Sequence, residues 1–363
     1  MGTVGASATR DLLGRQALAK TAVNGIVLGY GSVGRAHAAE LASMTSALAI
    51  LDVKEAARAH ALAAYASGII CCRLEELDRE AVDWASAVAV IATWGPSHAE
   101  LFHALADRGV RRILCEKPLA CSLAQAQGMV RRARTEGIAL GVHHVFRYAG
   151  FAAALRELAQ THALGSPVSL VVHGGAAGLI MNGIHFIDLA CELFGPPRHV
   201  ISTAHGEPIE PRNQDLLFYG GTIVWSFDGG REVVVAFSND CSIKWTVRIY
   251  FRDAFVDLGP DRRVLLMRRD PDAVTKAPAV TRTGAATQRL FEGPLPGVRT
   301  KEEAIRAALR DVMEGGATIC PGEVSLEALS ACVGALAASA ERRAVELPID
   351  PASHWGQMVW PFT

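Results

Sequence analysis

The sequence predicts an α/β protein in which a doubly wound parallel sheet is followed by a part rich in antiparallel strands. Short apolar runs alternate with helical segments up to Tyr148, which is typical of a parallel sheet covered on both faces. A glycine-rich turn separates the first apolar run from the first helical segment. From Val200 to Leu266 the pattern changes, and segments of alternating polar and apolar residues dominate.

The first part is expected to begin with a strand at Gly25, and further strands are expected at 47–53, 87–93, 111–119 and 138–148. Alanine-rich or amphipathic segments between these runs predict helices up to 43, at 55–66, from near Ser97 to 109, and at 122–135. Strands and helices that alternate at this spacing indicate βαβ units, which build a doubly wound sheet.

The second part is expected to contain a helix at 150–161, a loop that enters a helix at 181–195, and helices at 301–314 and 325–342. Strands are expected at 166–174, 199–206, 215–221, 222–230, 231–239, 244–253, 254–260 and 344–349. The pairs Gly220-Gly221 and Gly229-Gly230 predict turns between neighbouring strands of an antiparallel meander. The stretch 268–299 has no clear periodicity and is expected to be a long loop.

The composition favours a small-molecule ligand. Half of the 363 residues are hydrophobic, the formal net charge is −1 and the pI is about 6.9, so neither a nucleic acid nor a membrane is expected as a partner. Residues 1–21 lack the apolar core of a secretory signal and are expected to form a flexible extension. None of the eight cysteines forms a C-x-x-C pair, which predicts reduced core thiols in a cytoplasmic protein and no metal site.

The glycine turn "GYGSVG" has the G-x-G-x-x-G pattern at Gly29, Gly31 and Gly34. In a dinucleotide site these glycines allow a tight turn, close approach of the pyrophosphate and close packing of helix on strand. The following helix, from Ser32 and Val33 onward, offers free N–H groups to the phosphates. The pattern is weak alone, but here a strand precedes it and a helix follows it, which favours a Rossmann dinucleotide site over a merely structural turn.

Asp52 ends the next strand and bears on the choice of cofactor. A carboxylate at this position accepts hydrogen bonds from the adenosine ribose and repels a 2'-phosphate, which favours NAD over NADP. Lys54 lies two residues later and would soften that repulsion, although a solvated side chain is the simpler interpretation. We therefore expect NAD, with NADP as a possible second cofactor.

Polar residues follow three of the predicted strands, at Thr93 to His98, Glu116 to Pro118 and His143 to Arg147. Ligands of doubly wound sheets bind beyond the carboxyl ends of the strands. Glu116 and Lys117 are therefore expected to face the nicotinamide end of the cleft, with the amine of Lys117 where a substrate hydroxyl loses its proton.

The motifs "GYGSVG", "CEKPLA" and "NGIHFIDL", in this order and spacing, resemble the glucose–fructose oxidoreductase, inositol dehydrogenase and rhizopine-catabolism (Gfo/Idh/MocA) family. The resemblance covers nearly the whole chain from Gly25. It implies a dinucleotide-binding domain at 22–146 and an α+β domain at 147–363. The latter would carry a large, open, mostly antiparallel sheet that serves substrate binding and formation of a homodimer or homotetramer, with the last helices packed back toward the first domain.

The resemblance also implies roles for individual residues. The lysine of the E-K-P motif is catalytic or holds the substrate hydroxyl in the family, and that role falls on Lys117, with Pro118 in the cis form. His185 matches a histidine that shares the proton transfer, for which a pKa near neutrality is suited. The predicted cofactor-binding residues are Gly29, Gly31, Ser32, Val33, Asp52, Thr93, His98, Glu116 and Lys117.

The chain departs from the family pattern four residues before His185, where many members carry an aspartate and this chain has Met181. Asn182 follows and is expected to bind a substrate hydroxyl, although an amide cannot act as a base. Asp188 is expected to orient the helix or the histidine. Glu116 is expected to point away from the amine of Lys117, toward backbone or ribose.

Several polar residues keep two interpretations. Arg147 would either bind a substrate carboxylate or phosphate or form an interdomain ion pair, and His144 is its expected companion in substrate binding. Trp94 would stack on the nicotinamide or cover the core, and His98 would contact the cofactor or begin the helix.

Three functions are compatible with these residues. The first is NAD(P)-dependent hydride transfer to or from a secondary alcohol or ketone of a sugar, an inositol or a nucleotide-linked amino sugar. The second keeps the cofactor but cleaves a glycoside or epimerises a sugar with no net redox change. The third is a non-catalytic dinucleotide-binding protein, against which the presence of Lys117 and His185 argues.

Overall fold

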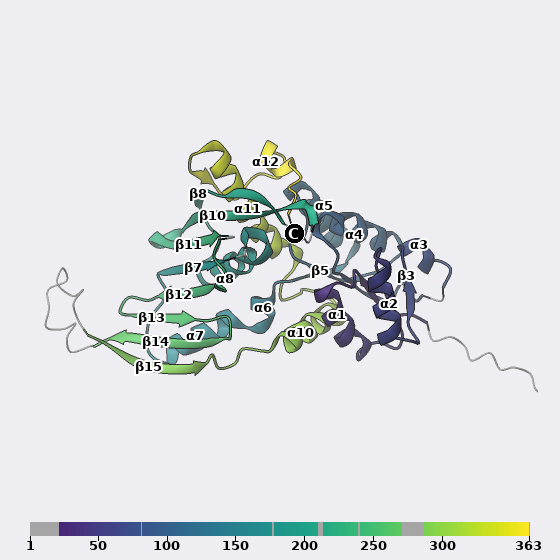
Figure 1. The fold of residues 1–363 in the computed structure, drawn as a ribbon, viewed down its shortest axis with the longest axis horizontal. Helices are drawn as coiled ribbons and strands as arrows, with labels where there is room; N and C mark the ends of the chain where they lie inside the picture. Colours follow the sequence, from purple (N-terminus) through teal and green to yellow (C-terminus); the bar gives the residue numbers. More distant parts are fainter. Residues whose placement is uncertain are drawn as a thin grey trace, which may run out of the picture.

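A computed structural model describes residues 22–80, 82–175, 178–209, 213–238, 240–270 and 286–362. The predicted extension at 1–21 lies outside these residues. The chain forms two lobes side by side, each built on its own sheet (Figure 1). This arrangement confirms the predicted fold class of a doubly wound parallel sheet joined to a large, mostly antiparallel sheet.

The first sheet has six parallel strands in the order β3-β2-β1-β4-β5-β6, the doubly wound order with a switch point between β1 and β4. Its strands are β1 (Gly25–Leu28), β2 (Leu48–Leu51), β3 (Ile69–Cys71), β4 (Val88–Ile91), β5 (Arg112–Glu116) and β6 (Ala139–His143). Its helices are α1 (Ser32–Ala42), α2 (Glu55–Ala64), α3 (Leu74–Leu77), α4 (His98–Asp107) and α5 (Leu123–Glu136), with a 3₁₀ turn at Gly95–Ser97 before α4. Every residue of β1, β2 and β4 is buried, which explains why these strands read as continuous apolar runs.

The second sheet has ten strands in the order β15-β14-β13-β12-β7-β11-β10-β8-β16, with β9 paired to β10. These strands are β7 (Ser169–Gly175), β8 (His199–Ser202), β9 (His205–Ile209), β10 (Asn213–Phe227), β11 (Arg231–Ser238), β12 (Thr246–Tyr250), β13 (Ala254–Leu258), β14 (Arg263–Arg269), β15 (Thr287–Pro294) and β16 (Val345–Glu346). The pairs are antiparallel except β7 with β11. In β11 and β13 buried residues alternate with less buried ones, as expected for a sheet with one covered face.

The helices of the second part join the two lobes. They are α6 (Val145–Ala149), α7 (Phe151–Thr161), α8 (Ile184–Phe194), α10 (Lys301–Glu314), α11 (Gly322–Glu341) and α12 (His354–Gln357), and a π-helical turn at Gly178–Gly183 precedes α8. Helix α10 packs on α1 and β6, and α11 packs on α5, α8 and β8. The C-terminal segment adds another link, because the N–H of Trp360 donates to the Cys121 carbonyl and the N–H of Leu217 donates to the Pro361 carbonyl.

Three predicted elements were wrong. The strand expected at 138–148 ends at His143, and Val145–Ala149 forms α6, a helix too short to show its periodicity in an apolar sequence. Gly220 and Gly221 lie inside β10 instead of in a turn: Gly221 has φ +118°, and a Cβ there would lie 2.6 Å from the Thr203 carbonyl. The pair therefore permits close approach of two strands.

The third error concerns the loop expected at 268–299, which contains strand β15 paired with β14. Residues 271–285 of that loop lie outside the described part of the chain.

Helix α11 is long and apolar enough to cross a membrane by length and composition alone, and among the described residues it is the one helix of that kind. It lies in the core, and 67% of its most apolar window is buried inside the protein. Its apolar surface is thus explained by packing, including a hydrogen bond from the indole of Trp225 to the Ala331 carbonyl.

Candidate active site

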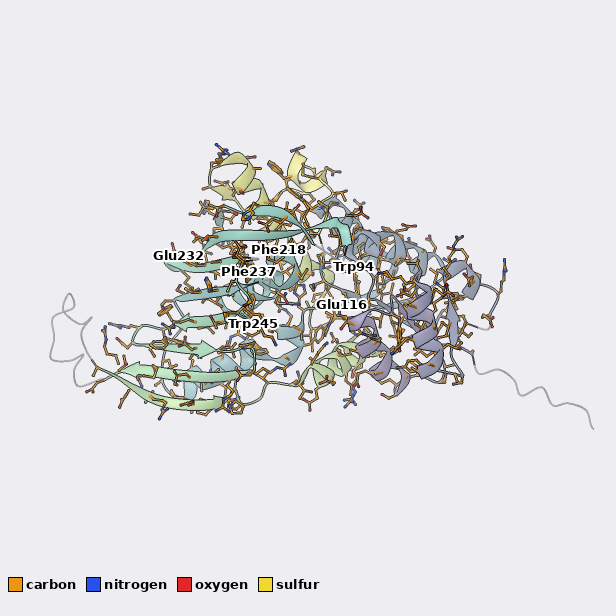
Figure 2. All side chains as sticks on the ribbon, viewed as in Figure 1. Trp94, Glu116, Phe218, Glu232, Phe237 and Trp245 are labelled. Atoms are coloured by element: carbon orange, nitrogen blue, oxygen red, sulfur yellow. The ribbon has the colours of Figure 1, made fainter. Side chains whose placement is uncertain are left out.

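The candidate site lies where the two lobes meet, beyond the carboxyl ends of β1, β4, β5 and β6. Trp94 and Glu116, which follow β4 and end β5, lie in this region (Figure 2). The π-helical turn Gly178–Gly183 and the start of α8 face it from the second lobe, because Lys117 bonds to Met181 there.

The glycine turn has the geometry of a phosphate-binding loop. Gly29 has φ +90°, and a Cβ there would lie 2.6 Å from the Ala92 carbonyl oxygen. A Cβ on Gly34 would lie 1.9 Å from the Gly29 carbonyl oxygen, so this glycine permits close packing of helix on strand. A Cβ on Gly31 would meet nothing within 4 Å, which leaves the space where a pyrophosphate would approach. Ser32 and Val33 form the first turn of α1 beside this space.

Asp52 contacts the same glycine loop. Its carboxylate accepts hydrogen bonds from the N–H of Tyr30 at 2.7 Å and of Lys54 at 2.8 Å. Arg58, which the sequence analysis did not single out, donates to the carbonyls of Asp52 and Val53 and so fixes this turn. A carboxylate held here can still accept ribose hydroxyls, and the residues present fit NAD.

His98 has a connecting role. Its ring is fully buried, with Nδ1 2.8 Å from the Pro118 carbonyl oxygen and Nε2 3.0 Å from the Thr93 carbonyl oxygen. Burial lowers the pKa of this histidine. The ring therefore ties the loop after β4 to the E-K-P turn, and of its two predicted positions the structure shows the helix start. The hydroxyls of Thr93 and Ser97 form a hydrogen bond. Trp94, which lies between these residues in the sequence, is partly exposed.

Lys117 reaches from the first lobe to the second. Its Nζ donates to the Met181 carbonyl at 2.8 Å, and the peptide bond to Pro118 is cis, as the resemblance implies. Burial lowers the pKa of the amine, and the neighbouring Glu116 carboxylate opposes this effect. A lysine in this environment gives up its proton more readily than an exposed one.

His185 lies in the first turn of α8 and is 8% exposed. Its Nδ1 is buried without a partner, and its ring centroid lies 5.6 Å from that of His144 and 5.8 Å from that of Phe146. Burial, followed by the positive charge of Lys117, holds the pKa of His185 well below its usual range. This shift favours the neutral imidazole, which has one N–H and one lone pair.

Of the two interpretations of Arg147, substrate binding and an interdomain ion pair, the structure shows an ion pair. Its guanidinium donates to Asp188 at 2.8 Å and lies 3.7 Å from Glu192. Burial alone would lower the pKa of Arg147, but the hydrogen bonds to Asp188 raise it. Both acids lie on α8, so the pair fixes α6 against α8 within the second lobe, and Asp188 orients Arg147 rather than His185.

His144, the other predicted substrate ligand beside Arg147, is fully buried. Its Nε2 lies 2.9 Å from the hydroxyl of Ser325 on α11, and its Nδ1 lies 3.8 Å from Asp188. Burial lowers its pKa. These contacts place His144 behind His185, where it packs the helices together. Asn182, the third predicted ligand, lies in the π-helical turn next to Met181, so its backbone neighbours the acceptor of Lys117.

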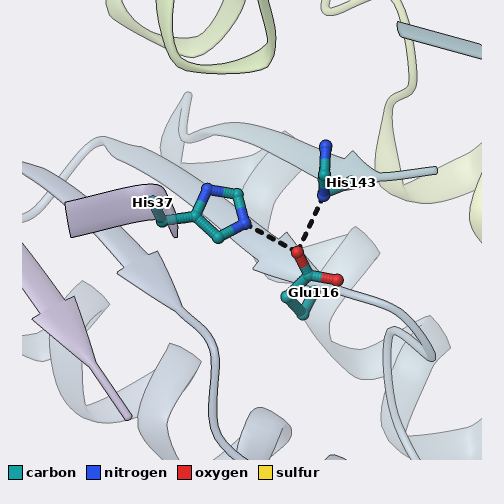
Figure 3. A group of neighbouring side chains, drawn as sticks. All are labelled: His37, Glu116 and His143. Atoms are coloured by element: carbon teal, nitrogen blue, oxygen red, sulfur yellow. Dashed lines mark hydrogen bonds and ion pairs between the residues drawn. The ribbon is translucent and has the colours of Figure 1, made fainter. Parts of the chain in front are cut away.

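Glu116 was expected to point away from Lys117, toward backbone or ribose, but the hydrogen-bond partners of its carboxylate are two histidine side chains. Its Oε1 accepts hydrogen bonds from Nε2 of His37 at 2.6 Å and from Nδ1 of His143 at 2.7 Å (Figure 3). Burial raises the pKa of Glu116, but its interactions with His143 and His37 outweigh this effect and hold that pKa well below its usual range. His37 was missed, although it lies on the buried stripe of α1 with Gly34, Ala38 and Leu41, a spacing that marks it as a core histidine.

Residues 23–144 match the family model described as "Oxidoreductase family, NAD-binding Rossmann fold" (GFO_IDH_MocA). The D-apiose dehydrogenase of Paraburkholderia graminis is 27% identical over 303 residues, which are 76% of this chain and 77% of that enzyme. Over residues 23–144 the chain thus matches the Gfo/Idh/MocA oxidoreductase family.

Other comparisons agree with this match. Inositol 2-dehydrogenase 1 of Mycolicibacterium vanbaalenii is 34% identical over 152 residues, 40% of this chain and 42% of that enzyme. Among solved structures, an oxidoreductase from Agrobacterium radiobacter in complex with NAD+, L-tartaric acid and magnesium superposes with a TM-score of 0.66 at 18% identity, over 89% of this chain and 97% of that one. A levoglucosan dehydrogenase in complex with NADH and levoglucosan superposes with a TM-score of 0.68 at 17% identity, over 90% of this chain and 100% of that one.

The matched model describes an NAD-binding oxidoreductase domain, and the relatives are named as dehydrogenases. The glycine loop and Asp52 lie within the matched residues, and their contacts with NAD stay a prediction.

Proposed function

We propose that this protein transfers a hydride between NAD and a secondary alcohol or ketone of a sugar or polyol. The observation that carries the proposal is the position of Lys117: a partly buried amine directly after β5 that reaches the turn before His185, at 2.8 Å from the Met181 carbonyl oxygen. A base buried between the cofactor lobe and the second lobe is suited to deprotonate an alcohol held in that cleft.

In the oxidative direction, Lys117 accepts the proton of the substrate hydroxyl: the O–H bond breaks and an N–H bond forms at Nζ. For this the amine must be uncharged, and burial lowers its pKa toward that state. NAD bound at the glycine loop supplies the hydride acceptor, and the alcohol carbon becomes a ketone. The Met181 carbonyl keeps the amine oriented across the cleft.

His185 is proposed to share this proton. It is neutral, it is buried on the same side of the cleft as Met181, and its pKa is lowered in part by the charge of Lys117. The two groups therefore sense each other's protonation, as a relay requires. Asn182 is proposed to donate to a substrate hydroxyl, which would give the site an orienting contact without a second carboxylate.

The substrate class is supported by the relatives, which are named as dehydrogenases or reductases of D-apiose, 1,5-anhydro-D-fructose, inositol and glucose 6-phosphate. All of these substrates carry secondary hydroxyl groups. We further propose that the protein is cytoplasmic, supported by its eight free cysteines, and that two or four copies assemble through the second sheet.

The test is a screen of pentoses, hexoses, inositols and nucleotide-linked sugars with NAD or NADH, read by absorbance of NADH at saturating cofactor. A substrate that reduces NAD, and whose turnover falls about 100- to 10,000-fold in Lys117→Met with nearly unchanged NADH affinity, is the expected result. Product formation without accumulation of NADH would instead identify a redox-neutral reaction. Wild-type turnover by Lys117→Met would remove the lysine from the mechanism.

A further inference from the structure

Three buried polar side chains from three separate elements meet behind the candidate site. His37 comes from α1, Glu116 from the end of β5 and His143 from the end of β6, and they are 0%, 8% and 4% exposed (Figure 3). Both histidines donate to the same carboxylate oxygen, Oε1 of Glu116. We call this group the Glu116 cluster.

The hydrogen bonds of the cluster define its charge. A neutral imidazole has one N–H and one lone pair, so donation to Glu116 leaves lone pairs on Nδ1 of His37 and on Nε2 of His143. Both of these atoms are buried without a partner. A proton on either would be a buried donor with no acceptor, which costs about 1–3 kcal/mol. The arrangement therefore consists of two neutral rings and one carboxylate, with a net charge of −1.

This charge lies directly beside the proposed base. Lys117 is the next residue after Glu116, and the carboxylate is the group that opposes the effect of burial on the amine. The groups that interact electrostatically with Lys117, Glu116 or His37 include imidazoles and one further lysine: His98, His144 and His185 around Lys117, His37 and His143 around Glu116, and Lys301 of α10 near His37. Glu116 is the acid among them.

We propose that His37 and His143 are positioning residues that keep Glu116 ionised, so that its buried charge stabilises the ammonium that Lys117 becomes when it accepts the substrate proton. The inference rests on the proposed role of Lys117. It adds a reason for the acid in the E-K-P turn and for a histidine on the dinucleotide-binding helix. Without the two donors, a carboxylate buried this deeply would take up a proton, and the ammonium would lose its counter-charge.

A bound metal ion is the other use for such residues, since the three ligand atoms lie within 4.8 Å of one another. The distances favour hydrogen bonds. Ligand atoms on one tetrahedral zinc ion, with bonds of about 2.0–2.1 Å, stand about 3.3 Å apart. Here both nitrogens lie 2.6 and 2.7 Å from one oxygen. The three side chains are thus held together by hydrogen bonds and not by a metal ion.

The first test needs no substrate. In protein labelled with ¹⁵N-histidine, the hydrogen bonds to Glu116 predict the neutral Nε2–H tautomer for His37 and the neutral Nδ1–H tautomer for His143. His37→Gln and His143→Asn assign the two signals. A positively charged ring or the opposite tautomer at either position would overturn the proposal. So would one equivalent of metal in the purified protein that is lost in His37→Leu.

The second test uses the pH profile of kcat/KM for alcohol oxidation. Glu116→Gln keeps the shape of the side chain and removes its charge, so the rise assigned to Lys117 is expected to move to lower pH by about one unit. His37→Leu and His143→Leu, which cannot donate, are expected to move it in the same direction. His37→Gln, which can donate, is expected to restore it.

A purely structural role predicts a different outcome. The leucine variants would then have lower thermal stability, but the rise in kcat/KM would stay at its wild-type pH in them and in Glu116→Gln. That result would overturn the proposal. Failure to find any substrate would count against the proposed function alone, because the tautomer measurement remains decisive for the cluster.

Discussion

At the scale of single residues, two glycines of the same motif differ in the space that surrounds them. Gly31 and Gly34 belong to the same motif but do different work: a Cβ on Gly31 would enter open space, and one on Gly34 would collide with the backbone of Gly29. The first position serves the ligand and the second serves the fold.

Gly31→Ala is therefore expected to abolish most NADH binding while the thermal stability stays near that of the wild type. The added methyl occupies the space where the pyrophosphate approaches. Titration of NADH fluorescence and a melting curve measure the two effects. Gly128→Ala is the matched control, since Gly128 lies within α5 and a Cβ there also meets nothing within 4 Å. Equal NADH affinity in both variants would contradict the assignment of the loop.

Asp52→Ala is expected to reduce the preference for NAD over NADP by weakening NAD binding and removing the repulsion of a 2'-phosphate. Arg58, which already bonds to the carbonyls of Asp52 and Val53, would then be a nearby cation for that phosphate. The ratio of the dissociation constants of NADH and NADPH measures the change. An unaltered ratio would mean that the carboxylate does not face the ribose.

His185→Ala is expected to lower turnover by about 10- to 100-fold, less than the loss in Lys117→Met, because a water molecule can replace part of its role. In the oxidative direction the wild-type rate should rise with pH as Lys117 loses its proton, and the pKa of that rise should lie below that of a free lysine. Single-turnover hydride transfer across pH measures both. A larger loss from His185→Ala than from Lys117→Met would reverse their roles.

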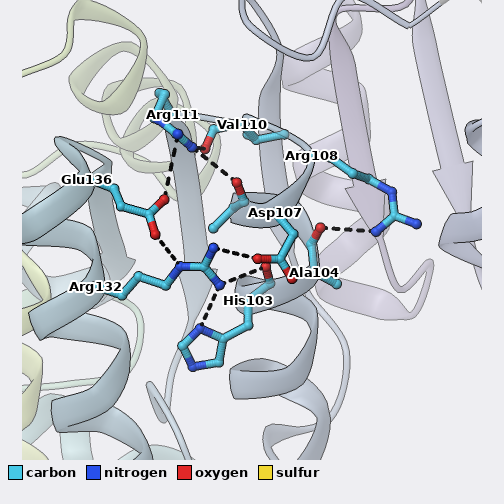
Figure 4. A network of polar contacts seen from close by, with 9 residues as sticks. His103, Ala104, Asp107, Arg108, Val110, Arg111, Arg132 and Glu136 are labelled. Carbon is cyan, nitrogen blue, oxygen red and sulfur yellow. Dashed lines mark hydrogen bonds and ion pairs between the residues drawn. The ribbon is translucent and has the colours of Figure 1, made fainter.

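At the scale of elements, helices of the first lobe are held by two kinds of contact. Helix α1 depends on close approach to β1 through Gly34, whereas α4 and α5 are joined at the surface by Arg132, which donates to Glu136, Asp107 and the His103 carbonyl (Figure 4). Exposed ion pairs of the latter kind contribute little to stability. The buried steric contact should therefore matter more than the visible network.

Gly34→Ala is accordingly expected to destabilise the protein by about 1–3 kcal/mol, the usual cost of overpacking, because its Cβ would lie 1.9 Å from the Gly29 carbonyl oxygen. Chemical denaturation measures the difference. Arg132→Ala serves as the comparison and is expected to change the midpoint less. The opposite ranking would show that the surface network, rather than the packing of α1 on β1, holds the lobe together.

At the scale of the whole molecule, the two lobes are expected to unfold together. Helix α10 packs on α1 and β6, α11 packs on α5, and the C-terminal segment bonds to both Cys121 and Leu217. Saturating NADH, at about 100 times its dissociation constant, adds about 2.7 kcal/mol to the stability of whatever unit carries the site. Calorimetry should show one transition that moves upward as a whole. Two transitions, of which NADH shifts only one, would show that the lobes are independent.

The sequence by itself determined the features that depend on neighbouring residues. Strand, glycine turn and helix follow one another at Gly25–Ala42, and the carboxylate of Asp52 and the E-K-P turn each follow a strand directly. Alternation of strands and helices then implies a parallel sheet whose carboxyl ends share one edge, so the general place of the site also follows from the sequence. The cis peptide before Pro118 was implied by the resemblance and is present.

Only the tertiary structure decided which polar groups pair, because those partners lie far apart in the chain. Glu116 accepts hydrogen bonds from residues that are 79 and 27 positions away in the chain. Arg147 pairs with Asp188, which follows it by 41 positions. A buried charge takes whichever partner packing brings within about 3 Å, and no local pattern records that choice. The same reasoning explains Gly221, which permits the close approach of Thr203 and does not form a turn.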